Sequence, residues 1–108
     1  MKFIKLLLVM FIPIIGYSQI NVIHFNANWN SSNDVKWVED LENCKVKYID
    51  IATDTDSQEK WEIVVVPTIL IVNEGEEVKR YQADISFTMK ATQDDVQEKI
   101  NEIYGDDF

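Results

Sequence analysis

The chain has 108 residues, of which 46% are hydrophobic and 11% aromatic, with only 3 Gly and 2 Pro. This length suits one small domain, and the composition excludes a repeat array or a long disordered tail. The formal net charge of −9 at pH 7 argues against nucleic acid as a partner and against anionic membrane surfaces, because both are negatively charged.

Residues 1–18 have the parts of a secretory signal peptide. Two basic residues, Lys2 and Lys5, precede an apolar run, and small residues come before a cut predicted after Ser18. The run is shorter than the roughly 20 apolar residues that span a bilayer. We therefore expect a secreted or periplasmic domain over 19–108, without stable membrane insertion after cleavage. An uncleaved anchor is the alternative.

Periodicity in the remaining chain predicts the order β-α-β-α-β-β-α. Alternating or buried apolar runs indicate the strands, and apolar residues at helical spacing indicate the helices. The predicted strands cover 21–26, 45–51, 69–72 and 77–82, and the predicted helices cover 31–43, 53 or 54 to 60 or 61, and 93–103. The fold class is therefore α/β, with a mixed central sheet and helices on both faces.

Capping residues and turn residues predict where these helices and strands begin and end. Ser31 or Ser32 is the expected N-cap of the first helix, with Asp34 in its first turn. Thr53 or Asp54 is expected to cap the second helix and Thr92 the last, which Gly105 should end. The sequence Asn-Glu-Gly-Glu over 73–76 predicts a hairpin turn.

Three segments in this order resemble the thioredoxin family. FNANWNSSN (25–33) lies over the family pattern F-W-A-x-W-C-x-x-C, and Val-Pro-Thr (66–68) over its cis-proline segment. The segment Tyr-Gln-Ala-Asp (81–84) is similar to the family segment that ends in Gly-Ala. The resemblance runs from about residue 22 to 103 and implies a minimal thioredoxin-like fold. The family's additional N-terminal strand and helix are absent.

The resemblance places asparagine at both redox positions. Asn30 and Asn33 stand where the family has its two cysteines, and Ser31 and Ser32 lie between them. Disulfide exchange needs a thiolate, and an amide supplies none, while a hydroxyl without an adjacent base stays protonated. The family's buried acid position carries His24, the only histidine. We expect no catalytic residue in this motif and no cofactor.

The single cysteine, Cys44, falls at the end of the first predicted helix, beside acidic residues. Neither the negative helix terminus nor the acidic neighbours would lower its pKa, so we expect a packing residue in a monomer. A Cys44-linked dimer is the alternative, since an odd cysteine in an exported protein can pair between molecules. Cys44 and His24 do not have metal-ligand spacing, so no metal site is expected.

The resemblance also implies a peptide-binding surface that needs no thiol. In the family, the backbone before the cis-proline pairs with an extended peptide, which is a form of β-augmentation. The corresponding residues here are Trp29, Val66, Pro67 and Ala83. The alternative is that Pro67 only shapes the turn into the following strand.

Together these features predict an exported thioredoxin-fold protein without the redox pair, acting as a non-catalytic protein- or peptide-binding module. The alternative function is that of a thiol-dependent oxidoreductase or isomerase-like helper, which would use Cys44 or a partner's thiols.

Overall fold

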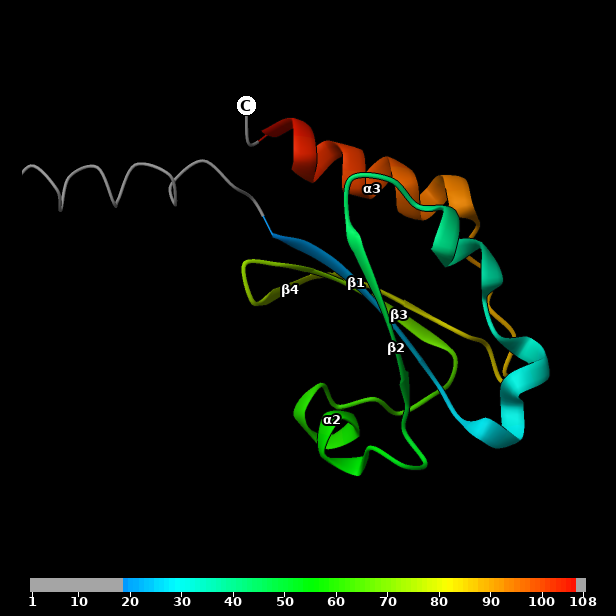
Figure 1. The fold of residues 1–108 in the computed structure, drawn as a ribbon. Helices are drawn as coiled ribbons and strands as arrows, with labels where there is room; N and C mark the ends of the chain where they lie inside the picture. Colours follow the sequence, from blue (N-terminus) through cyan, green and yellow to red (C-terminus); the bar gives the residue numbers. More distant parts are fainter. Residues whose placement is uncertain (1–18, 107–108) are drawn as a thin grey trace, which may run out of the picture.

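The structure is a computed structural model that describes residues 19–106. The predicted signal segment, 1–18, lies outside the described residues. Eight elements follow one another along the chain (Figure 1): β1 (Ile20–Asn26), η1 (Asn28–Asn33), η2 (Lys36–Asp40), β2 (Lys45–Asp50), α2 (Thr55–Lys60), β3 (Thr68–Asn73), β4 (Glu76–Gln82) and α3 (Gln93–Asp106). The predicted strands and the last two helices are confirmed, whereas the first helix differs.

The four strands form one mixed sheet in the order β2-β1-β3-β4. β1 pairs with β2 in parallel and with β3 antiparallel, and β3 pairs antiparallel with β4. β1 and β3 are central and almost entirely buried, as their near-continuous apolar sequences indicate. β4 is mostly exposed at one edge. This register places His24 directly beside Tyr48, which later forms one wall of a pocket.

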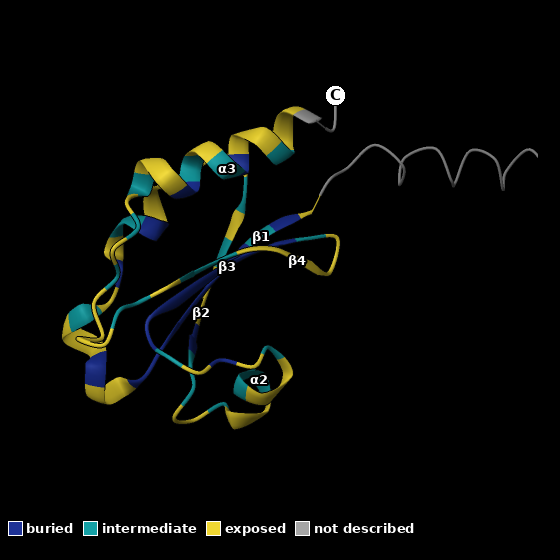
Figure 2. Ribbon diagram, turned by 180° about the vertical axis from the view of Figure 1, so that it is seen from behind, coloured by how far each residue is buried: buried dark blue, intermediate teal, exposed yellow. Residues whose placement is uncertain are grey.

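The sheet separates two apolar clusters, because successive side chains of a strand point to opposite faces. The cluster on the side of η1, η2 and α3 contains Ile20, Val22, Val35, Val38, Leu41, Ile69, Ile71, Val96 and Ile100. The cluster on the side of α2 contains Ile23, Phe25, Ala27, Ile49, Ile63, Val66, Leu70 and Val72. Figures 1 and 2 show α3 and α2 on opposite sides of the buried strands. The prediction of helices on both faces is confirmed.

The prediction of one α-helix over 31–43, capped by Ser31 or Ser32, is wrong. Two short 3-10 helices, η1 and η2, take its place, and the residue before η1 makes no side-chain cap. Asp34, between them, is not helical, with φ of −55° and ψ of 140°. The backbone amide of Val35 donates to His24 Nε2 over 3.0 Å. Because this amide bonds to a side chain of β1, it is not available to continue a helix.

The caps of the other helices follow the sequence more closely. Asp54 accepts a hydrogen bond from the Ser57 amide at the start of α2, over 3.0 Å. At the start of α3, the Thr92 hydroxyl accepts from the Asp95 amide and the Asp95 carboxylate accepts from the Thr92 amide, which is a capping box. Gly105 does not end α3 as predicted, because the helix continues to Asp106.

The hairpin between β3 and β4 is confirmed. Glu74 and Gly75 both have positive φ, 53° and 86°, as expected for a tight turn whose twist matches the strands. Glycine adopts this conformation without a steric penalty.

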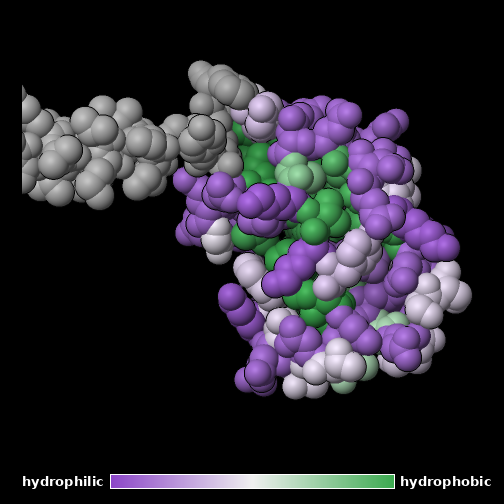
Figure 3. Space-filling view, viewed as in Figure 1, coloured by the Kyte–Doolittle hydropathy of each residue, from purple (hydrophilic) through white to green (hydrophobic). Residues whose placement is uncertain are grey.

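The face of the molecule drawn in Figure 3 is mainly hydrophilic. In Figure 3 hydrophilic residues surround an apolar area that is visible at the middle of the face. No helix within residues 19–106 is long and apolar enough to cross a membrane.

Candidate functional site

The segment that resembles the redox motif is held in place by a pair of asparagines. The side-chain amide of Asn30 donates to Asn26 Oδ1 over 3.0 Å. In return, the side-chain amide of Asn26 donates to the Asn30 carbonyl over 3.0 Å. Both residues are buried, with 5% of their surface exposed. This reciprocal pair ties η1 to the end of β1 and satisfies polar groups that would be costly to bury alone.

Further hydrogen bonds extend this pair into a network. Asn33 donates from its side chain to Asn30 Oδ1 over 2.8 Å, and Asn26 donates to Asp34 Oδ1 over 2.6 Å. Asn30 also donates to the Phe87 carbonyl over 3.2 Å, across 57 residues of sequence. Asn30 and Asn33 therefore both act as hydrogen-bonding groups, and the Asn30 side chain is covered by the chain after β4. Ser31 and Ser32 lie inside η1 and are exposed.

His24 lies beneath this network and is 2% exposed. Its Nε2 accepts from the Val35 amide, and its ring lies 5.0 Å from that of Tyr48. Burial lowers the pKa of His24 below its ordinary value of 6.5, although the Asp34 carboxylate acts in the opposite direction. The neutral ring therefore carries its proton on Nδ1, because Nε2 is an acceptor.

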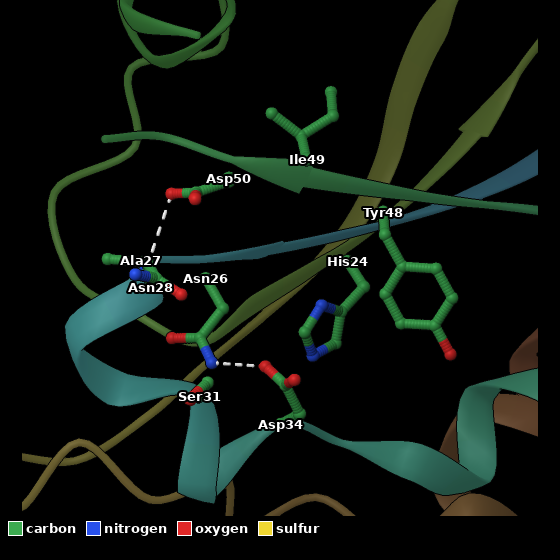
Figure 4. Close-up of a pocket in the computed structure, with 9 residues that line it drawn as sticks. All are labelled: His24, Asn26, Ala27, Asn28, Ser31, Asp34, Tyr48, Ile49 and Asp50. Carbon is green, nitrogen blue, oxygen red and sulfur yellow. Dashed lines mark hydrogen bonds between the residues drawn. The ribbon is translucent and has the colours of Figure 1, made fainter. Parts of the chain in front are cut away.

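A pocket of about 250 Å³ opens where β1 and β2 end. Figure 4 shows the side chains of His24 and Asn26 from β1, Tyr48 and Asp50 from β2, and Asp34 after η1. Its full lining is His24, Asn26, Ala27, Asn28, Ser31, Asp34, Tyr48, Ile49 and Asp50. The pocket thus combines hydrogen-bonding groups with two carboxylates.

The residues expected to bind peptide backbone are only partly at the surface. Trp29 is 66% exposed, whereas Val66 is 3% exposed and Pro67 is fully buried. The Val66–Pro67 peptide bond is cis. Ala83 is half-buried, and its amide donates to the Pro67 carbonyl over 3.0 Å. The structure brings Pro67 and Ala83 together, but it uses the Pro67 carbonyl within the chain.

The exposed Trp29 has an aromatic neighbour that the sequence did not indicate. Its ring meets that of Phe87 edge-on, with centroids 5.3 Å apart. Phe87 is 42% exposed and has a positive φ of 62°. Ile85, in the same loop, is 97% exposed. Trp29 and Phe87 thus form an aromatic pair that is accessible to solvent, and the loop that carries Phe87 also exposes Ile85.

The loop that presents Phe87 is organised by Asp84. The Ser86 amide and hydroxyl both donate to the Asp84 carboxylate, and Lys90 forms an ion pair with it over 3.3 Å. The Phe87 amide donates to the Asp84 carbonyl over 3.0 Å. The hydrogen bonds from Ser86 lower the pKa of Asp84 to about 2.

Cys44 lies between η2 and β2 and is half-buried. It packs against the apolar cluster beneath α3. Burial raises the pKa of its thiol above the ordinary value of 9.0, so the thiolate is disfavoured. In the described part of the chain, no three His, Cys, Asp or Glu residues lie close enough to hold a metal ion.

Sequence reasoning identified His24 and the asparagines but missed Asn26, Tyr48, Asp50 and Phe87. Asn26 could have been found, because it lies two residues after His24 on a predicted strand and must share its face. Tyr48 and Asp50 join the pocket through the parallel register of β1 and β2. Phe87 reaches the motif through a loop whose path no local pattern predicts.

No family model and no curated protein matches the chain. Among solved structures, it is similar to a mutant thioredoxin from Halobacterium salinarum, with a TM-score of 0.63 and 17% identity over 78% of this chain and 74% of that one. A poplar thioredoxin h mutant gives a TM-score of 0.60 and 22% identity, over 81% and 67% of the two chains. Thioredoxin-2, a component of the malaria parasite protein secretion machinery, gives a TM-score of 0.60 and 14% identity, over 79% of this chain and 84% of that one.

Proposed function

Because the chain has a thioredoxin-like fold, we propose that it is an exported, non-catalytic binding module for a protein or peptide partner. The observation that carries this proposal is that Asn30 and Asn33, which the resemblance places at the cysteine positions, have side chains that are hydrogen-bonded into the local structure. Neither amide can form the mixed disulfide that exchange requires.

The exposed aromatic residues supply the binding surface in this proposal. Trp29 and Phe87 are in edge-to-face contact and both remain accessible, and Ile85, two residues before Phe87, is almost fully exposed. Aromatic residues are enriched at the energetically important centres of interfaces. Because Val66 and Pro67 are buried, side-chain contacts with Trp29 and Phe87 replace backbone pairing as the main mode of recognition.

A pull-down from the exported fraction tests the surface. The wild-type protein is compared with Trp29→Ala and with Val64→Ala, a matched control that truncates another apolar residue, 87% exposed. The proposal predicts a partner that is retained by wild type and by Val64→Ala but lost with Trp29→Ala. An identical set of bound proteins for all three baits would contradict it.

Export is a separate part of the proposal and has its own test. It is supported by the basic start and the apolar run within residues 1–18. N-terminal sequencing of the secreted or periplasmic protein should begin at Gln19. A protein that keeps Met1 or stays with the membrane fraction would support the uncleaved anchor instead.

The alternative role, thiol chemistry through Cys44, is less well supported. The cysteine is half-buried and lies outside the motif, and its raised pKa works against a reactive thiolate. Insulin reduction that is lost on Cys44→Ser would favour this alternative and would overturn the binding-module proposal.

A further inference from the structure

We propose that the pocket between η1 and the end of β2 binds an organic ammonium group with a neighbouring hydrogen-bond acceptor, as found at the amino terminus of a peptide. Neither Trp29 nor Phe87 lines this pocket, so the site is additional to the binding surface proposed above. Its volume of about 250 Å³ lies just below the range of sites for drug-sized ligands, and it suits a group about as large as one residue.

Two carboxylates give the pocket its preference for a cation. Asp34 uses Oδ1 to accept from Asn26, and Asp50 uses Oδ1 to accept from the amides of Ala52 and Asn28. Within residues 19–106, no Lys or Arg forms an ion pair with either carboxylate. The second oxygen of each is therefore available to a ligand. A cation would offset two negative charges that the protein itself leaves uncompensated.

The electrostatic environment of Tyr48 supports the same preference. Apart from burial, the carboxylates of Glu39, Asp34 and Asp40 raise the pKa of this phenol. Of these residues, Tyr48 and Asp34 line the pocket, and the whole chain carries a net charge of −9. An anionic ligand would be repelled from this position.

His24 also favours a ligand with a hydrogen-bond acceptor, which a simple cation lacks. Its Nε2 accepts from Val35, so Nδ1 carries the proton, and no other described residue accepts it; Nδ1 interacts only with the backbone of His24 itself. The ring is 2% exposed and lines the pocket. A carbonyl next to the ammonium group would accept this proton, whereas guanidinium has no acceptor. Because the ring is neutral, it does not repel the cation.

Titration with alaninamide, followed by NMR of the His24 ring and the backbone amides, tests the site. Saturable shifts at His24, Asn28 and Asp50 are expected, with a dissociation constant on the order of millimolar for so small a ligand. N-acetylalaninamide lacks the charge and ethylammonium lacks the acceptor. Each should bind at least about fivefold more weakly. Equal binding of N-acetylalaninamide at the same resonances would overturn the proposal.

Two matched variants test whether the negative charge of Asp50 contributes to alaninamide binding. Asp50→Asn keeps an oxygen that can accept from the Ala52 and Asn28 amides but removes the carboxylate, and it should weaken alaninamide binding about five- to tenfold. Asp56→Asn makes the same change at an exposed position in α2 and should leave binding unchanged. Equal effects of the two variants would contradict the proposal.

Three further measurements complete the test. If Asp50→Asn fails to fold, raising the salt concentration for the wild-type protein should weaken alaninamide binding, and no salt dependence would contradict the proposal. A tetrapeptide amide with a free amino terminus should bind at least as tightly as alaninamide. Binding of the small amine alone would overturn the assignment to a peptide. Trp29→Ala should leave alaninamide binding intact, so failure of one proposal is distinguishable from failure of the other.

Discussion

The Val35 backbone amide donates to Nε2 of the buried His24 over 3.0 Å, and this contact joins β1 to the two-residue segment between η1 and η2. It makes a protonated His24 incompatible with the local fold, because an imidazolium has no acceptor nitrogen. The shape of the motif segment thus depends on the charge state of one side chain in the neighbouring strand.

This contact predicts that acid destabilises the protein through His24. Burial lowers the folded-state pKa below the ordinary 6.5, so the unfolded chain binds the proton more readily. The contribution of His24 is complete above about pH 6.5 and is lost as the pH falls toward the lowered pKa, by at most about 1.4 kcal/mol per pH unit.

Urea unfolding at several pH values between 5 and 8 measures this effect. His24→Gln is a suitable reference, because its amide oxygen can accept from Val35 without titrating in this range. The free energy of unfolding of wild type should fall more steeply with acid than that of the variant. Parallel curves would show that His24 does not cause the loss.

The asparagine network predicts unequal costs for its two motif residues. Asn30→Ala removes a buried amide that bonds to Asn26, Asn33 and the Phe87 carbonyl, and it should lower the free energy of unfolding by about 2–3 kcal/mol. Asn33→Ala removes one bond from a half-buried residue and should cost about 1 kcal/mol. Equal losses by urea unfolding would argue against a network centred on Asn30.

Introducing cysteines at positions 30 and 33 should not create reductase activity. Position 30 is 5% exposed and is covered by the chain at Phe87, so a thiol there would be inaccessible and its pKa would rise on burial. We expect the Asn30→Cys, Asn33→Cys variant to reduce insulin no faster than wild type. An increase of tenfold or more would mean that the segment retains a catalytic geometry.

Cys44 should react slowly with alkylating reagents at neutral pH. Burial raises its pKa above 9.0, and only the thiolate is nucleophilic. The rate of iodoacetamide modification should therefore continue to increase beyond pH 9, and more slowly than for a free cysteine peptide under the same conditions. A plateau near pH 8 would instead identify an activated thiol and favour the alternative function.

The local signals in the sequence were sufficient for the strands and for two of the three predicted helices. Buried apolar runs specify β1 and β3, and the capping residues Asp54 and Thr92 lie where their short-range hydrogen bonds require them. These features depend on neighbours within a few residues, so their physical cause is present in the sequence. The predicted first helix is not formed, because the Val35 backbone amide donates to His24, which lies on another element, and not to a carbonyl within the helix.

The sequence by itself determined that positions 30 and 33 supply no thiol, because both are asparagine and cannot act as thiols in any fold. Only the tertiary structure decided what these residues do instead. The Asn26–Asn30 pair, the cover at Phe87 and the pocket beside Tyr48 all join segments that are separate in sequence. Their positions follow from the pairing of β1 with β2 and from the path of the loop after β4, and both are set by packing of the whole domain.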